Sequence, residues 1–180
     1  MSTRKDELLD AAIAYVVETG VANLSLRPMA EALGTSARIL LFHFGSKEGL
    51  LQAVFAAMHA RLQASFAAMA ATPSEAVPLK RFWQWAIAKE NAPVLRTLYE
   101  AHVVAAQNPH VYGRYLEQAS ADWQQAALRA LSPGLRSGPM ATLCIAVFDG
   151  LFLELMRTGE RARLTRALDQ FIALAQRSLE

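Results

Sequence analysis

The sequence predicts an all-α protein, on three observations. Apolar residues recur three and four positions apart through almost the whole chain, which is the spacing of amphipathic helices. No alternation of polar and apolar residues is long enough to indicate a strand. Glycines and prolines divide the helical pattern into three short helices followed by a bundle of five to six longer helices.

The composition is that of a globular protein. The chain has 180 residues, of which 53% are hydrophobic and 19% are charged. A chain of this length and composition can bury a core of its own, which excludes a disordered protein. The single cysteine, Cys144, excludes a disulfide framework and any metal site built from several cysteines. The formal net charge of +2 is too small to indicate a partner by itself.

Nothing in the pattern of apolar segments predicts targeting to a membrane. The residues from Met1 to Glu7 are mostly polar or charged, so no secretory signal is expected. The longest uncharged apolar stretch near the C-terminus, Ser137 to Phe148, is shorter than the roughly 20 residues of a membrane span. We therefore expect a cytoplasmic protein with no membrane partner.

The first 50 residues predict three short helices and the start of a long one. Their boundaries carry residue types that suit helix ends, serine as an N-cap and glycine in the turn that follows. The first helix is expected over residues 4–18, with Gly20 as a left-handed C-cap. The second is expected to begin after Ser25 and the third to end near His43. The other boundary residues are Gly34, Ser36 and Ser46, of which the last caps the long helix.

The later helices are longer and are separated by prolines. Helix breaks are expected at Thr72-Pro73 and Val77-Pro78, before Pro93, at Asn108-Pro109 and in the loop of residues 132–139. No flexible linker or internal repeat interrupts this series.

Residues 25–44 combine a short helix, a glycine turn and a second short helix, which is a helix-turn-helix arrangement. Leu40 and Phe44 are four residues apart and are expected to face the core. This leaves an outward face on the second helix, of the kind that enters the major groove of DNA. The expected outward residues are Ala37, Arg38, Leu41 and Phe42.

The charge of this segment supports DNA binding only locally. Residues 1–50 carry five basic and six acidic side chains, a net charge of −1. The acidic residues lie mainly on the first helix, whereas the basic ones surround the expected recognition helix. Each basic residue also has an ordinary interpretation, as a solvated surface charge or, for His43, as a turn residue bonded to backbone.

Over about residues 8–55 the sequence resembles the TetR family of transcriptional repressors. The matching positions are Leu9, Ala12, Gly20, Ser25, Met29, Ala30, Leu33 to Ser36, and the run from Leu40 to Leu50. That last run, at its spacing from Gly34, is specific to the family. Beyond residue 55 the resemblance rests on the number, length and order of the helices.

The resemblance implies a helix-turn-helix DNA-binding domain over residues 1–47 and a ligand-binding and dimerisation domain over residues 48–180. Leu41 departs from the family, because many members have a phosphate-bonding tyrosine there. Ile39 and Arg38 likewise replace a common threonine and a common glycine. The residues expected to contact DNA are Arg27, Ser36, Ala37, Arg38, Leu41, Phe42, His43 and Lys47.

The later helices contain aromatic and sulfur-containing side chains with two possible roles. Such residues at helical spacing usually form a core, but helical bundles also bind small molecules between facing helices. The second interpretation predicts a site for a small, partly apolar ligand, with Tyr99 and His102 as its polar residues. The candidate ligand-binding residues are Met58, Leu62, Trp83, Tyr99, His102, Trp123, Cys144 and Phe148.

The last two helices have broad apolar surfaces, which form either the core of one subunit or a dimer interface. The resemblance implies a four-helix interface between two copies, and a palindromic DNA operator requires two reading heads. The candidate interface residues are Leu143, Val147, Leu151, Leu155, Leu164, Leu168, Phe171 and Ile172.

We therefore expect a homodimeric, ligand-controlled transcriptional regulator, a repressor in the usual mode of the family, that binds a palindromic double-stranded operator. The alternatives are an all-helical enzyme and a helical interaction module without DNA binding. The enzyme is disfavoured because the four histidines are scattered and Cys144 has no base beside it in sequence. No catalytic residue, metal ligand or cofactor is assigned.

Overall fold

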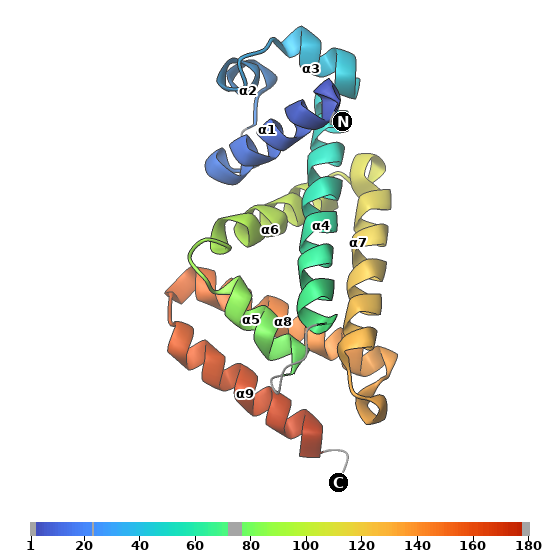
Figure 1. Cartoon of the computed structure of the whole chain (residues 1–180), viewed down its shortest axis with the longest axis vertical. Coiled ribbons are helices and arrows are strands. Elements are labelled where there is room, and N and C mark those ends of the chain that lie inside the picture. The colour runs from blue at the N-terminus through green and yellow to red at the C-terminus, as the bar shows by residue number, and fades with distance from the viewer. Residues whose placement is uncertain (1–2, 23, 72–76, 178–180) are drawn as a thin grey trace. The chain divides into compact units, whose positions relative to one another are not determined.

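The computed structural model describes residues 3–22, 24–71 and 77–177, and over these residues the chain is helical and contains no strand (Figure 1). This confirms the predicted all-α fold class. Over the described residues, three helices are followed by six more. The α-helices are α1 (Arg4–Thr19), α2 (Leu26–Ala32), α3 (Ala37–Phe44), α4 (Lys47–Ala71), α5 (Pro78–Ala86), α6 (Ala92–Gln107), α7 (Pro109–Ala130), α8 (Gly138–Thr158) and α9 (Arg161–Arg177). A short 3-10 helix, η1 (Pro133–Leu135), lies in the predicted loop between α7 and α8. The predicted break at Thr72-Pro73 lies outside the described residues.

The chain forms two compact units. The first comprises the described residues of 1–62 together with 92–119, and the second those of 63–91 together with 120–180. Helices α4 and α7 each contribute residues to both units.

Helix α1 begins with a complete capping box. The Thr3 hydroxyl accepts the amide N–H of Asp6 at 3.2 Å, and the Asp6 carboxylate accepts the amide N–H of Thr3 at 2.9 Å. The helix ends at Gly20, as predicted, but not in the left-handed conformation. Gly20 has φ +82° and ψ 175°, so its φ is positive but its ψ lies far from that of a left-handed cap.

The helix-turn-helix forms as predicted, with one correction. Gly34 has φ +62° and makes the turn, and the Ser36 hydroxyl accepts the amide N–H of Ile39 at 3.3 Å, which caps α3. Ser46 likewise accepts the amide N–H of Gly49 at 2.9 Å. Ser25 occupies the N-cap position of α2, but its side chain makes no capping hydrogen bond, so the predicted side-chain cap is wrong there.

The joint between α3 and α4 is closely packed. Gly49 lies in the first turn of α4, and a Cβ atom at this position would overlap the backbone carbonyl oxygen of Phe44. Since Phe44 is the last residue of α3, only glycine allows the two helices to meet at this distance.

Replacing Ser36 with Ala is expected to lower the free energy of unfolding by about 1 kcal/mol, because one amide of the first turn of α3 loses its cap. Thermal unfolding followed by circular dichroism should show a decrease of about 2–4 °C. Ser25→Ala is the matched control, since Ser25 has the same backbone position but no capping bond. Equal decreases in the two variants would contradict the assignment.

The second unit is built around aromatic side chains of α5 and α8. Phe82 stacks on Phe148 with ring centroids 4.8 Å apart, and Trp83 meets Phe148 edge to face at 5.9 Å. The Trp83 indole N–H donates to the Thr165 hydroxyl of α9 at 2.9 Å, and Lys80 pairs with Asp169 at 2.7 Å. These contacts tie α5 to both later helices.

Helix α8 carries more apolar surface than this core covers. Among the described residues it is the one helix whose length and composition would allow it to cross a membrane, and only 22% of its most apolar stretch is buried. The helix is longer than the uncharged stretch of Ser137 to Phe148 because it continues through Asp149 and Glu154, and the core helix of a soluble protein meets the same criteria. Its exposed residues Leu143, Ala146, Gly150 and Leu153 follow one another at spacings of three and four, and so form one stripe.

Candidate DNA-binding site

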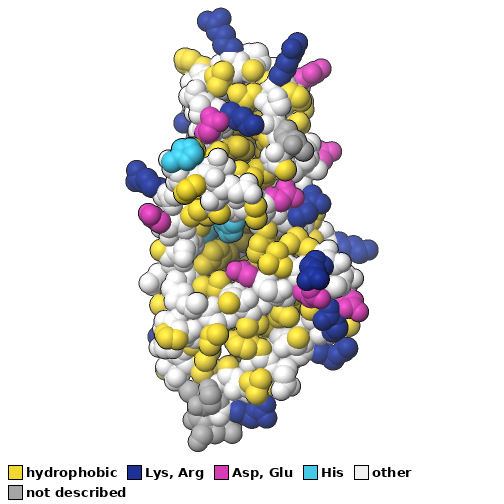
Figure 2. Space-filling view, turned by 180° about the vertical axis from the view of Figure 1, so that it is seen from behind, with side chains coloured by type: hydrophobic (Ala, Val, Ile, Leu, Met, Phe, Trp, Pro, Cys, Tyr) yellow, Lys and Arg dark blue, Asp and Glu magenta, His cyan; other side chains and the backbone are white. Residues whose placement is uncertain are grey.

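Helix α3 has a buried face and an exposed face, as the sequence predicts. Leu40 is completely buried, whereas Phe42 is 80% exposed and Leu41 is 40% exposed. Arg38, in the first turn, is also exposed. At the top of Figure 2, where α2 and α3 lie, Lys and Arg side chains project from a surface of polar and hydrophobic atoms.

The other predicted DNA-contacting residues lie on the elements next to this face. Arg27 is exposed on α2, and Ser36 is exposed at the N-cap of α3. Ala37, His43 and Lys47 are half-buried, and the His43 ring packs edge to face on Phe42 with centroids 5.2 Å apart. All eight predicted residues therefore lie on α2, on α3 or its N-cap, or at the first residue of α4.

The end of α3 differs from the prediction. Phe44 was expected to face the core with Leu40, but it is only half-buried. The ammonium group of Lys5, on α1, lies 5.5 Å from the centre of the Phe44 ring. This is a cation–π contact, and it fastens the start of α1 to the end of α3. No pattern along the sequence indicates the pairing of these two residues.

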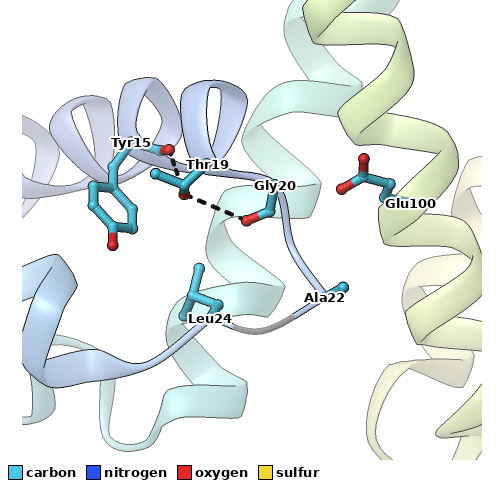
Figure 3. A pocket seen from close by; sticks show the side chains of 6 residues that line it. All are labelled: Tyr15, Thr19, Gly20, Ala22, Leu24 and Glu100. Atoms are coloured by element: carbon cyan, nitrogen blue, oxygen red, sulfur yellow. Dashed lines mark hydrogen bonds between the residues drawn. The ribbon is translucent and has the colours of Figure 1, made fainter.

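A second contact missed by the sequence analysis lies at the turn between α1 and α2. The Glu100 carboxylate, on α6, accepts the amide N–H of Val21 at 3.0 Å. A shallow pocket of about 240 Å³ lies beside it, lined by Tyr15, Thr19, Gly20, Ala22, Leu24 and Glu100 (Figure 3). None of the predicted ligand-binding residues lines this pocket.

The predicted ligand-binding residues divide between the two units. In the first unit, Met58 and Leu62 are buried, and the Tyr99 and His102 rings are 6.4 Å apart. The His102 ring also lies 5.8 Å from that of Tyr115, a residue of α7 that the sequence analysis did not identify. The Nε2 atom of His102 and the hydroxyl of Tyr115 are buried and have no hydrogen-bond partner.

The ionisation of these groups reflects their burial. Desolvation lowers the pKa of His102, and the neighbouring His59 lowers it further. Desolvation raises the pKa of Tyr115 to about 12. Both groups are therefore neutral at pH 7, and each has a polar atom that a bound molecule could satisfy.

The four remaining candidates, in the second unit, mostly have the character of a core. Trp83 is completely buried and its indole N–H is already bonded to Thr165. Phe148 is buried, and Trp123 is half-buried with its ring 5.6 Å from that of Phe82. Burial raises the pKa of the Cys144 thiol, so the thiol is protonated and a poor nucleophile.

The predicted interface residues differ in exposure. Leu164 and Leu168 are buried within one copy of the chain. Val147, Leu151, Leu155, Phe171 and Ile172 are half-buried, and Leu143 is 52% exposed. Further exposed apolar residues, which the sequence analysis did not identify, are Leu153 and Met156 on α8 and Leu174 on α9.

The turn at Gly34 and the exposed face of α3 place this domain in the helix-turn-helix class of DNA-binding folds. The family model described as "Bacterial regulatory proteins, tetR family" matches residues 8–54. Over these residues the chain is similar to the TetR family, which confirms the resemblance found in the sequence. The proteins that this model describes are regulatory proteins.

Solved structures show the same fold over the whole chain. A transcriptional regulator from Rhodococcus sp. Rha1 is 18% identical, with a TM-score of 0.80, and the match covers 98% of this chain and 97% of that one. A proposed transcriptional regulator from Pseudomonas aeruginosa PAO1 is 22% identical, with a TM-score of 0.72 and coverages of 98% and 94%. The multidrug binding protein EbrR complexed with ethidium is 21% identical, with a TM-score of 0.70 and coverages of 94% and 99%. The search of curated proteins gave no match.

Proposed function

We propose that this protein is a cytoplasmic transcriptional repressor that binds a palindromic operator as a homodimer and leaves it when a small ligand binds. Residues 1–47 would read DNA, and residues 48–180 would bind the ligand and the second subunit. The observation that carries the DNA-binding part is the exposed face of α3, where Arg38, Leu41 and Phe42 stand outward while Leu40 is buried.

Each exposed side chain has a chemical role at a duplex. Arg38 is suited to a guanine edge or a phosphate, and Arg27 to a base edge from the preceding helix. Leu41 and Phe42 are suited to apolar contact with thymine methyl groups. His43 and Lys47 lie closer to the body of the domain and are assigned to the phosphate backbone, which fixes the position of the protein without reading sequence.

The homodimer is supported by the apolar surface of the last two helices. Leu143, Leu153 and Met156 on α8 and Leu174 on α9 are large hydrophobic residues that are between 41% and 54% exposed. Apolar residues this exposed on neighbouring helices are typical of an interface. Ala146 and Gly150 lie between Leu143 and Leu153, and their small size allows a second helix to approach closely.

The ligand site is proposed in the first unit, at Tyr99 and His102. His102 Nε2 and the Tyr115 hydroxyl support this position. Buried polar atoms usually have hydrogen-bond partners, and a bound ligand would supply the partners that these two atoms lack. The surrounding Phe55 and Tyr112 rings lie 5.7 Å apart and supply apolar contact. A neighbour of similar fold, the multidrug binding protein EbrR, has been solved with imidazole and with ethidium.

Selection from random duplexes should recover a palindrome, and the double variant Arg38→Ala with Lys47→Ala should bind it at least about 100-fold more weakly than the wild type. Each residue provides a charged contact, and each lost phosphate contact reduces the dependence of binding on salt. Fluorescence anisotropy at several salt concentrations measures both effects. The matched control is Arg129→Ala, which removes an exposed arginine from the last turn of α7. A wild type that selects no sequence would contradict the proposed function.

A further inference from the structure

Glu100 reaches from α6 to the turn that precedes the helix-turn-helix. One carboxylate oxygen, Oε2, accepts the Val21 amide N–H at 3.0 Å, and the other, Oε1, lies 3.6 Å from Nε of Arg96. Val21 and Glu100 are 79 positions apart in the sequence. The bond therefore joins the first 47 residues to a helix of the later part of the chain, within the first compact unit.

The turn is shaped to receive this carboxylate. Gly20 has φ +82°, which disfavours any other residue, and a Cβ atom there would lie 3.1 Å from Oε2 of Glu100. Figure 3 shows the carboxylate of Glu100 directed toward the backbone at Gly20. Val21 and Leu24 are buried in the turn, and the Glu100 carboxylate is the acceptor of the Val21 amide N–H.

We infer that Glu100 is a positioning residue for DNA binding, which fixes the α1–α2 turn and thereby the placement of α2 and α3 against the operator. This inference rests on the proposed function. Helix α2 begins at Leu26, five positions after Val21, and α3 packs on α2. A turn that loses its anchor displaces both helices, although Glu100 itself makes no contact with DNA.

The same helix carries the proposed ligand-binding residues. Tyr99 and His102 lie one and two positions from Glu100, and the His102 ring packs on Tyr115 of α7. Helix α6 thus has the α1–α2 turn on one face and the buried aromatic groups on another.

Three variants at this position test the inference. Glu100→Ala removes the acceptor, Glu100→Asp retracts it from Val21 while keeping the charge, and Glu100→Gln keeps an acceptor oxygen at full length. We expect operator dissociation constants about tenfold higher for the Ala and Asp variants and within about threefold of wild type for the Gln variant. Hydrogen exchange of the Val21 amide should accelerate in the first two variants and change little in the third.

Two controls separate this role from a general loss of stability. Glu117→Ala removes an exposed carboxylate of α7, and Arg96→Ala removes the ion-pair partner of Glu100 while leaving the bond to Val21. Both should bind the operator like the wild type. Thermal unfolding of every variant identifies any that fails to fold. If Glu100→Ala fails to fold, Glu100→Asp provides the test in its place.

The inference is overturned if the Ala and Asp variants fold and bind the operator with wild-type affinity, or if the Gln variant is as weak as the Ala variant. A wild type that binds no duplex removes the proposed function and this inference together. Faster exchange at Val21 with unchanged operator affinity removes only the inference. The two failures are therefore distinguishable.

Discussion

Replacing both Leu143 and Leu153 with Glu is expected to convert the protein into a monomer and to weaken operator binding by at least about 100-fold. Both leucines are about half exposed on one stripe of α8, where a second subunit would cover them. A charge buried in an apolar interface is strongly unfavourable, so the variant subunits should separate. Two linked reading heads gain about 10²–10⁴ in affinity over one, and a monomer loses that gain.

Sedimentation equilibrium measures the mass of the variant, and fluorescence anisotropy measures its affinity for a palindrome and for a single half-site. For a single half-site, the affinities of the variant and the wild-type protein should differ less than they do for the palindrome, because only one DNA-binding domain is engaged. The matched control is Gln125→Glu, which adds a negative charge at an exposed position of α7. A wild-type protein that sediments as a monomer at micromolar concentration would be incompatible with the proposed homodimer.

Replacing Trp83 with Ala is expected to lower the free energy of unfolding by about 3–5 kcal/mol. The indole is completely buried, packs on Phe148 and donates a hydrogen bond to Thr165, so its removal leaves both a cavity and an unpaired hydroxyl. Proteins of this size have a total stability of about 5–15 kcal/mol, so the loss is a large part of it. Urea unfolding followed by circular dichroism measures the change.

Trp83→Phe separates the two contributions, because it retains most of the ring and loses the bond to Thr165. Its expected cost is about 1–3 kcal/mol. Gln84→Ala, at the next and exposed position of α5, should change the stability by less than about 0.5 kcal/mol. If Trp83→Ala were as mild as Gln84→Ala, the indole would not belong to the core and would again be a candidate for ligand contact.

The recognition helix was predictable because its signals are local. Gly34, Ser36 and the apolar positions of α3 lie within a dozen residues, and their spacing fixes both the turn and the outward face. Ser25 shows the limit of this approach. The residue type is correct for an N-cap, but whether a side chain makes the bond depends on its rotamer, which composition does not determine.

Helix α8 was harder to interpret because it is apolar around most of its circumference. The sequence analysis selected Leu143, Val147, Leu151 and Leu155, spaced by four, whereas the exposed stripe runs from Leu143 through Ala146 and Gly150 to Leu153. Periodicity identifies a face only when the opposite face is polar. The covered side of α8 is the one on which α5 and α9 pack, and the sequence does not show where these two helices lie.

The contacts made by Glu100 and Tyr115 had no signal in the sequence. Each depends on residues that are far apart along the chain, such as the 79 positions between Val21 and Glu100. A single carboxylate on a helix is ordinarily a solvated surface charge. Only the fold shows that this carboxylate replaces a missing backbone partner.

The overlap that any side chain at position 49 would create has a mechanical consequence. Because the first turn of α4 lies directly against the last carbonyl of α3 at Gly49, the two helices cannot approach each other more closely at this joint. A larger residue at position 49 would therefore push the end of α3 away from the first turn of α4 and change the angle between the two helices.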